Sequence, residues 1–518
     1  MMRKKWHKLA MLVISVLLVA GMMPVMAFAD ESGNAAKIDD VEYATLDEAV
    51  NAAKDGDTIT ILKDCSTSGL NLNKTLTING ENKTITFADK GIALWGKSLT
   101  FNNSNIIMNG IGSTPYAEWS WMAICANKDA SLNLNNSTMT MDGTGTSDKT
   151  HAVYFCSNNK LNLDNSTLKI TSYAQDALEW DGGDEGYNIN IVNGSKFISD
   201  HNRSGFTGTF IATIKNSTVD VINSTGNGSN GSHFEIENST VNFNDNGSHG
   251  LSAGKLTIDN SKVYALRNGA NGVHAASKLT VKNKSLLDIE GNKCSISSKW
   301  TKPGALYVGG TDSEIDSSCN VTIKDNMGSG IYVKERASLE MQAGSVTGNT
   351  AEKLLFGGGV NNNGTFIMGD AVRIYNNQAD SAGDDVYASE NALTSLVDET
   401  KDMKLTFTVR CDGTHLINGW YDDSEQVRWN VHTEDESLLH YEKQDNLELE
   451  GTAALKAAHD KASVTPTDPT TPTQPTDKTA GSETKTGDDS QLGLCIALAL
   501  ASAIGLTGVL IISRRKRA

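Results

Sequence analysis

Cysteine, proline and basic charge are all scarce in this chain. Seven cysteines in 518 residues are too sparse for the disulfide framework that holds small secreted domains together. Lysine and arginine number 45 against 62 aspartates and glutamates, and no basic stripe with interleaved aromatic residues occurs, which argues against a nucleic-acid partner. The ten histidines show no metal-ligand spacing. The histidines therefore indicate no metal centre. What the chain does contain is an internal repeat between two distinctive end segments.

The two ends of the chain predict export and tethering. Residues 1–29 combine a basic start, an apolar run and a small-x-small ending, the layout of a signal peptide. Leu492–Ile512 is a run of 21 residues without charge, long enough at about 1.5 Å per residue to span a bilayer core. The basic segment at 514–517 should stay cytoplasmic, which places the remaining chain outside the cell.

The segment before this span predicts an extended stalk. Residues 464–487 are rich in threonine, proline and aspartate, a composition that favours a semi-rigid spacer. Its end, "ETKTGDD" (Glu483–Asp489), resembles the sorting signal of Gram-positive surface proteins, in which an L-P-x-T-G pentapeptide precedes an apolar span and a basic tail. Thr486 and Gly487 match the last two positions, whereas Glu483 and Thr484 replace Leu and Pro. The resemblance implies sortase cleavage after Thr486 and attachment to peptidoglycan; retention in the membrane is the alternative.

An internal repeat anchored on asparagine occupies much of the chain between these ends. Successive copies lie 33, 29, 28, 23, 22, 22 and 23 residues apart. The positions four and two before each asparagine, and three and five after it, are apolar at 30 of 32 places. This pattern predicts a strand, a turn at the asparagine and a second strand. The repeated asparagines are Asn103, Asn136, Asn165, Asn193, Asn216, Asn238, Asn260 and Asn283.

A unit of 22 residues cannot bury its own apolar face, so neighbouring units must stack around a shared core. Two or three short strands in that length fit one coil of a parallel β-helix, and longer intervals then carry loops. Asparagine suits the turn because it tolerates left-handed backbone angles and can bond the equivalent residue one coil away. We therefore interpret "NST" at Asn216 and Asn238 as a turn, and predict that neither carries a sugar.

A short helix is predicted before the repeat, in "ATLDEAVNAAKDGDTITIL" (Ala44–Leu62). Thr45 and Glu48 form a capping box at its start, and the turn at 55–57 leads into the first strand. The helix should cover the open end of the β-helix, whose unpaired backbone groups would otherwise invite aggregation. Its apolar face consists of Leu46, Ala49, Val50 and Ala53.

This segment and the coils after it resemble the pectate-lyase-like right-handed β-helix superfamily over residues 40–390. "FGGGVNNNGTFIMGDAVRIYNN" (Phe356–Asn377) is similar to glycine-rich coils of Gram-positive adhesin-like repeats. The resemblance implies an all-β chain built as a right-handed parallel β-helix. The expected divisions are a signal peptide at 1–29, the capped β-helix at 30–399, a small β cap or appended module at 400–463, the linker at 464–487, and the sorting signal, transmembrane helix and basic tail at 488–518.

Candidates for catalysis are few. The acidic stretch "QDALEWDGGDEGY" supplies Asp176, Glu179, Asp181, Asp184 and Glu185, and "GSHGLS" supplies His249. The second stretch resembles the G-H-G motif of polygalacturonase-type glycosidases, but the other motifs of that family are missing. Lyases of the pectate class use an arginine base beside calcium, and Arg203 and Arg267 stand alone in the sequence. A calcium site at Asp181 and Asp184 is the alternative to an ordinary turn; no other cofactor is expected.

Candidates for binding are aromatic residues in predicted insertions: Tyr116, Trp119, Trp121 and Trp180. Aromatic rings on loops beside acidic groups suit glycan stacking, although such tryptophans also pack onto the coil beneath them.

Two pairs of cysteines occupy similar places in successive coils: Cys125 with Cys156, and Cys294 with Cys319. Each pair is expected either to form a disulfide or to consist of buried apolar residues.

Three functions remain open on this basis. The first is a non-enzymatic cell-surface adhesin that recognises a host surface or an extracellular glycan. The second is a polysaccharide lyase or glycoside hydrolase, with Asp181, Asp184 and His249 as candidate catalytic residues. The third is a structural spacer.

Overall fold

The computed structural model describes one continuous part of the chain and a few short stretches beyond it. Of two units, Met1–Thr465 and Pro466–Ala518, only the first contains described residues. They are 33–396, apart from 117–120, 157, 182–186, 295–302, 353–354, 381–384 and 390–391, and then 419–422, 427–430, 448–450 and 454–456.

Several sequence predictions fall elsewhere. The signal peptide, most of 400–463, the linker, the sorting signal with Thr486 and Gly487, the span at 492–512, Trp119 and Asp184 lie outside the described residues. Among the helices that the structure describes, none is both long and apolar enough to cross a membrane.

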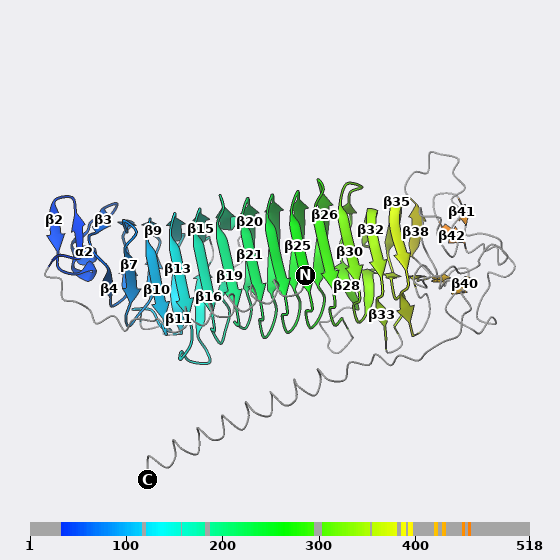
Figure 1. Cartoon of the computed structure of the whole chain (residues 1–518), viewed down its shortest axis with the longest axis horizontal. Helices are drawn as coiled ribbons and strands as arrows, with labels where there is room; N and C mark the ends of the chain where they lie inside the picture. Colours follow the sequence, from blue (N-terminus) through cyan, green and yellow to red (C-terminus); the bar gives the residue numbers. More distant parts are fainter. Residues whose placement is uncertain are drawn as a thin grey trace, which may run out of the picture. The chain divides into compact units, whose positions relative to one another are not determined.

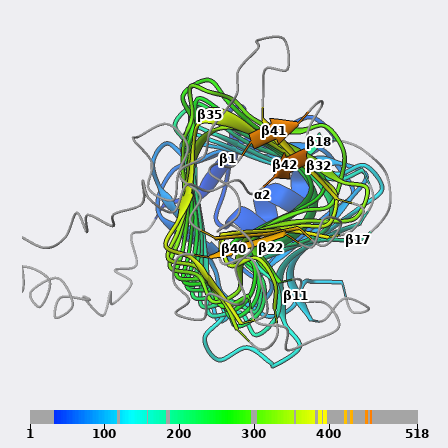
Figure 2. The same ribbon diagram turned by 90° about the vertical axis from the view of Figure 1, so that its right-hand side faces the viewer.

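Most of the described strands form a parallel β-solenoid, in which a strand pairs with its equivalents in the neighbouring coils (Figure 1). Viewed along its axis, the coils superimpose around a common interior (Figure 2). Three parallel ladders follow from the pairings, and we name them face A, face B and face C in the order in which each coil visits them. The predicted β-helix is confirmed.

Face A contains β5 (Leu70–Leu72), β8 (Ile92–Trp95), β11 (Met122–Asn127), β14 (His151–Cys156), β17 (Leu178–Asp181), β28 (Gly304–Val308), β31 (Ser329–Val333), β34 (Val360–Asn362), β37 (Val386–Ala388) and β39 (Gly419–Asp422). Face B contains β3 (Thr58–Ile61), β6 (Leu76–Asn79), β9 (Ser98–Asn102), β12 (Ser131–Asn135), β15 (Lys160–Asp164), β18 (Tyr187–Val192), β29 (Ser313–Ile315) and β38 (Leu393–Leu396). Four strands run continuously from face A into face B: β20 (Phe206–Lys215), β22 (Ser229–Glu237), β24 (Leu251–Asp259) and β26 (Val273–Lys282).

Face C contains β4 (Cys65–Thr67), β7 (Thr84–Phe87), β10 (Asn105–Asn109), β13 (Thr138–Asp142), β16 (Thr167–Thr171), β19 (Lys196–Asp200), β21 (Thr218–Ile222), β23 (Thr240–Asn244), β25 (Lys262–Leu266), β27 (Leu286–Glu290) and β30 (Asn320–Lys324). Two strands run from face B into face C: β32 (Ser338–Thr347) and β35 (Thr365–Tyr375). The remaining strands are β1 (Ala36–Ile38), β2 (Val41–Tyr43), β33 (Thr350–Ala351), β36 (Gln378–Ala379), β40 (Val427–Asn430), β41 (Glu448–Glu450) and β42 (Ala454–Lys456).

The core follows the predicted period of two. In the coil around Asn103, the four apolar positions Leu99, Phe101, Ile106 and Met108 are fully buried, and their neighbours along the strands are not. Because the strands are in register, each of these side chains stacks on an apolar side chain of the next coil.

The two polar exceptions in the apolar pattern, Lys196 and Asp288, have a structural cause. Their coils carry one additional residue at the corner, so that Gly194 and Lys284 also take positive φ angles, 82° and 62°. The inward positions of the following strand are thereby displaced by one residue, and Phe197 and Leu287 are buried instead. The prediction that residues 196 and 288 face inward is therefore wrong.

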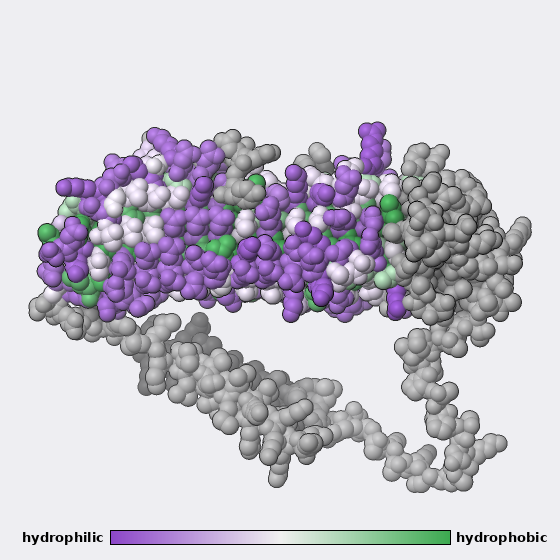
Figure 3. Space-filling view, turned by 90° about the horizontal axis from the view of Figure 1, so that it is seen from above, coloured by the Kyte–Doolittle hydropathy of each residue, from purple (hydrophilic) through white to green (hydrophobic). Residues whose placement is uncertain are grey.

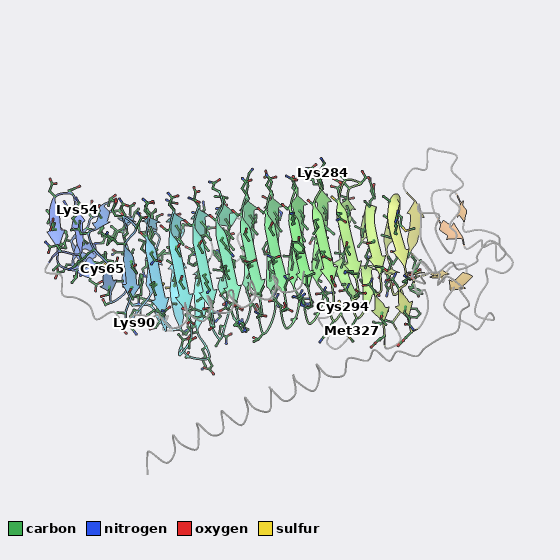
Figure 4. The ribbon with its side chains drawn as sticks, viewed as in Figure 1. Lys54, Cys65, Lys90, Lys284, Cys294 and Met327 are labelled. Atoms are coloured by element: carbon green, nitrogen blue, oxygen red, sulfur yellow. The ribbon has the colours of Figure 1, made fainter. Side chains whose placement is uncertain are left out.

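The corner between faces B and C is the predicted asparagine turn. All eight asparagines have positive φ, from 45° to 58°. Some amides bond directly from coil to coil, as Asn165 Nδ2 does to Asn136 Oδ1 (2.8 Å) and Asn260 Nδ2 to Asn238 Oδ1 (2.6 Å). Lys284, which follows Asn283, lies at the upper edge in Figure 4.

A buried serine ladder, which the sequence analysis missed, lies beside this corner. The backbone N–H of Ser217 donates to Ser239 Oγ (3.1 Å), and that of Ser239 donates to Ser261 Oγ (3.0 Å). These hydroxyls satisfy backbone donors that the left-handed turn leaves without a strand partner. The "NS" of six copies is thus a turn residue followed by a ladder residue, and in the copies at Asn193 and Asn283 the ladder residue, Ser195 or Ser285, comes one position later.

A second asparagine ladder occupies the corner between faces C and A. Asn268 Nδ2 donates to the Phe243 carbonyl and to Asn292 Oδ1, both at 2.9 Å, and Asn292 repeats the arrangement with Asn326. Cys294, Met327 and Lys90 lie along this lower edge in Figure 4. The fully or nearly fully buried members are Asn246, Asn268, Asn292, Asn326, Asn349 and Asn377.

The N-terminal end is closed by helix α2 (Leu46–Ala52). Thr45 Oγ1 accepts from the Glu48 N–H (3.1 Å), and Leu46, Ala49, Val50 and Ala53 are buried, which confirms the predicted helix and its apolar face. Two strands that the sequence did not predict, β1 and β2, precede it, and β1 pairs antiparallel with β3. In the axial view α2 lies within the outline of the coils (Figure 2).

Candidate functional site

Outward positions on face A bring together the predicted aromatic and acidic segments. Cys125 on β11, Tyr154 on β14 and Glu179 on β17 are direct register partners on adjacent coils. In the same three coils, loops from the cyan part of the chain, including the one at 143–150, extend beyond the outline of the other coils near β11 (Figure 2). The side of the solenoid that Figure 3 shows is mostly hydrophilic.

A network of ionisable groups lies at the start of β14 and β17. His151 Nδ1 is 2.5 Å from Glu179 Oε2 and 3.8 Å from Asp176 Oδ2. Asp176 is fully buried, and it accepts from Arg203 Nε (3.2 Å) and from the Arg203 Nη2 group. The carboxylate of Asp176 keeps the pKa of Arg203 above its usual value. A charge buried in this way is stable only with such partners.

A second pair lies beside this network. Tyr154 donates its hydroxyl hydrogen to Asp181 Oδ2 (2.6 Å). Burial raises the pKa of Tyr154, and the adjacent Asp181 carboxylate raises it further. Tyr154 therefore stays a neutral donor at physiological pH, and Asp181 is held as an acceptor at the exposed end of β17.

Trp121 packs against the rings of His151 and Tyr154. Its ring centroid is 5.5 Å from that of His151 and 5.8 Å from that of Tyr154, in edge-to-face arrangements, and 39% of the residue is exposed. Tyr116 and Tyr154 pack against a small apolar cluster outside the main core, formed by Ala93, Met122 and Cys125. The predicted surface aromatics Tyr116 and Trp121 thus do lie on one face, beside carboxylates.

Trp180 does not belong to this surface. It lies in β17 with 2% of its surface exposed, between Phe155 (4.8 Å) and Phe210 (6.1 Å), and its Nε1 donates to the Asn159 carbonyl (3.2 Å). The prediction that it stacks on a ligand is wrong, because residue 180 is an inward position of the strand.

His249 lies apart from this network, before β24. Burial lowers its pKa, and its ring is 5.7 Å from that of His274, which itself stacks on Tyr307 at 4.3 Å. The two histidine rings come from neighbouring coils and are tilted by 43° to each other. His249, His274 and Tyr307 form a row of rings on successive coils. Among the described residues, His249 has no contact with Asp176, Glu179 or Asp181.

The cysteines of the described residues are free thiols. Cys125 is the register partner of Tyr154, not of Cys156, which explains why that pair is not bonded. Cys294 Sγ donates to the Ala270 carbonyl (3.3 Å), and Cys319 Sγ donates to Asp316 Oδ1 (3.2 Å). The disulfide alternative is therefore wrong for both pairs, and Cys125, Cys294 and Cys319 are buried residues.

The sequence analysis missed His151, Tyr154 and Arg203 as site residues. Arg203 was expected to stand alone but pairs with Asp176 across one coil, and Arg267 likewise pairs with Asp245 at 2.7 Å. The segment "HAVYFC" could have indicated two of them. In this strand the polar residues His151 and Tyr154 stand among apolar residues and are only partly buried.

Comparisons with known proteins add little to this description. No family model matches the chain, and no curated protein matches it. Among solved structures, a mutant of the periplasmic alginate epimerase AlgG is similar at 12% identity and a TM-score of 0.26, over 62% of this chain and 85% of the other. The unsubstituted AlgG is similar at 10% identity and a TM-score of 0.24, over 66% and 85%. Likeness at this level carries no argument about activity.

Proposed function

We propose that this protein is displayed on the cell surface and recognises an extracellular glycan through face A, around Trp121. The observation that supports this most directly is the convergence of three coils on one surface: Trp121 from the first, His151 and Tyr154 from the second, and Glu179 and Asp181 from the third.

The chemistry of these side chains suits a sugar. A partly exposed tryptophan offers an apolar face to the C–H groups of a pyranose ring. Carboxylates beside it accept hydrogen bonds from hydroxyl groups, and such charge-assisted bonds are stronger than neutral ones. Glu179 and Asp181 are held in β17, and the carbonyl of Trp121, directly before β11, accepts from the His151 N–H (3.0 Å), so these groups are preorganised for binding.

The charges favour a neutral glycan or an amino sugar over a polyuronate. Glu179 and Asp181 are both acidic, and the nearest guanidinium, Arg203, is already paired with Asp176. An anionic polysaccharide would meet like charges here, which costs binding energy.

Export and tethering form the second half of the proposal. They are supported by the sequence of residues 1–29 and of 492–512, and the resemblance of 483–489 to a sorting signal supports display on a Gram-positive surface. An adhesin role is then the simplest use of a glycan-binding face held away from the membrane on a stalk.

A glycan array followed by calorimetry tests the binding. We expect the wild-type exported chain to bind neutral or amino-sugar polymers more tightly than polyuronates, and Trp121→Ala to weaken binding by about tenfold or more, as loss of a central aromatic contact does. Tyr264→Ala, on face C, is the matched control and should bind like the wild type. Absence of any ligand on the array would instead favour the structural spacer.

Catalysis is a second candidate because acid and base groups are adjacent here, His151 with Glu179 and Tyr154 with Asp181. An assay of reducing ends and of unsaturated products across neutral and acidic glycans separates the two functions. Turnover that is lost in Asp181→Ala or Glu179→Gln would contradict a purely adhesive role. Turnover that is lost in His249→Ala would place the chemistry in the histidine ladder.

A further inference from the structure

One part of the network is incomplete as a set of hydrogen bonds. His151 Nδ1 and Glu179 Oε2 approach to 2.5 Å, yet they are not aligned as a hydrogen bond, and neither atom has another hydrogen-bond partner among the described residues. Both atoms are buried from water. Two lone-pair atoms so close together repel each other unless a proton or a metal cation lies between or beside them, since an unpaired buried polar atom is costly.

Asp176 completes a set of three potential ligands. One ligand atom each from His151, Asp176 and Glu179 lies within 4.8 Å of the other two. Their side chains are 11%, 0% and 21% exposed, which shields the group from bulk water. We propose that these three residues bind a first-row divalent metal ion such as Zn²⁺ or Mn²⁺.

The spacing of the ligand atoms is compatible with such an ion. A tetrahedral ion with ligand bonds of about 2.0–2.2 Å holds two ligand atoms roughly 3.3–3.6 Å apart. The observed separations from His151 Nδ1, 2.5 Å to Glu179 and 3.8 Å to Asp176, lie on either side of this range. Metal binding therefore requires Glu179 Oε2 to lie further from His151 Nδ1, and Asp176 Oδ2 to lie closer to it, than in this structure.

Arg203 fixes Asp176 without using up its capacity to bind metal. A carboxylate offers about four lone-pair positions, and Arg203 occupies two of them. A charged partner that orients a ligand carboxylate is a common feature of the shell around a metal. With a neutral imidazole, the two carboxylates outnumber the one guanidinium, so a divalent cation is electrostatically favoured.

The ligand types also select among ions. An imidazole nitrogen with two carboxylate oxygens suits Zn²⁺ or Mn²⁺, whereas Ca²⁺ takes oxygen ligands. Three protein ligands leave at least one coordination position for water or for an oxygen of a bound molecule. The metal site does not depend on the glycan proposal, because its ligands are all in the chain.

Calorimetry with metal salts alone tests the proposal. The exported chain is treated with a chelator, dialysed and titrated with ZnCl₂, MnCl₂ and CaCl₂, and bound metal is counted by mass spectrometry. We expect one Zn²⁺ or Mn²⁺ per chain and no competition from Ca²⁺. His151→Ala and Glu179→Gln should each abolish this binding, and Arg203→Lys should weaken it by about 10–100-fold.

His201→Ala provides the matched control, since His201 forms a similar pair with Asp200 (2.6 Å) but on an exposed turn. It should bind metal like the wild type. Glu179→Gln preserves side-chain volume, and a circular dichroism melt verifies that each variant is folded. No stoichiometric binding, or binding unchanged in folded Glu179→Gln and His151→Ala, would overturn the proposal. A chain that binds Zn²⁺ but no glycan would contradict only the proposed function.

Discussion

A corner asparagine can form the turn of its own coil and also a hydrogen bond with the next coil. Asn238 turns its own coil with a φ of 50°, and its Oδ1 accepts from Asn260 of the next coil. Ser239, directly after it, accepts from the Ser217 N–H and donates to the Glu237 carbonyl (2.7 Å). The side chain of Thr240, which completes the N-S-T sequence, is not part of this ladder. Lys262 occupies the equivalent position in the next coil, so threonine is not needed there.

Replacement of Ser239 by alanine should therefore destabilise the protein. The Ser217 N–H would be left buried without a partner, which costs about 1–3 kcal/mol. Thr240→Lys should change the free energy of unfolding by no more than about 0.5 kcal/mol, because this side chain faces outward. Urea unfolding of both variants measures the difference; equal effects would show that the serine ladder is not what preserves the motif.

Burial of His249 predicts a loss of stability in acid. Its folded pKa is lowered, chiefly by burial and against the opposing hydrogen bond with Asn271, whereas in the unfolded chain the imidazole titrates near 6.5. As the pH falls through about 7 to 5, the unfolded chain takes up a proton that the folded chain does not, so stability falls. His249→Gln should reduce the difference in Tm between pH 8 and pH 5. The exposed His201→Gln should not, and a full acid effect in His249→Gln would contradict the assignment.

Helix α2 is attached to the first coil by charged side chains at both of its ends. Thr67 and Ser68 donate to Asp47 in the first turn, and Lys74 Nζ donates to the carbonyls of Val50 and Ala53 (both 2.6 Å) at the last turn. A cation at a helix C-terminus also interacts favourably with the helix dipole.

Lys74→Met should loosen this end of the solenoid. Loss of bonds to a charged donor costs about 1.5–3 kcal/mol, and in a repeat structure such a loss acts on the nearest coils. Amide hydrogen exchange should accelerate in β1 and β3 but not in β25. Lys54→Met, at an exposed lysine of the same region, is the control. Uniform exchange across all coils would show that α2 does not act as a cap.

Strands and the helix could be predicted from the sequence because neighbouring residues determine them. Contacts between side chains of different coils could not, because they depend on how the coils stack. The strands around Asn103 and the helix begun by Thr45 follow from period and capping, which a single segment displays. Trp180 was misplaced because an inward tryptophan and a loop tryptophan look alike without the register. His151, Glu179 and Arg203 lie on three successive coils. They come close only because the coils stack in register, which the sequence does not display.

At the scale of the whole molecule, the coils are repeated units that vary in length. The coils at Asn216, Asn238 and Asn260 are regular: their strands pair residue by residue on face C, and these asparagines lie 22 residues apart. Stability in such an array is approximately the sum of the coils and their interfaces.

Deletion of residues 239–260 should therefore leave a folded, shorter solenoid, because Asn238 would then be followed by Ser261 and the N-S corner would be restored. Deletion of 239–249, half a coil, should abolish cooperative unfolding, since inward residues would be displaced from the core. Circular dichroism melts compare the two. Equal damage from both deletions would contradict a modular solenoid.

The most direct test of the account is hydrogen–deuterium exchange of the full chain with and without the glycan that binds it best on the array. The account predicts that protection is concentrated in β11, which Trp121 directly precedes, and in β14 and β17, which carry His151 and Glu179 on face A. Protection confined to face C, for example in β21, β23 and β25, would contradict the proposed site.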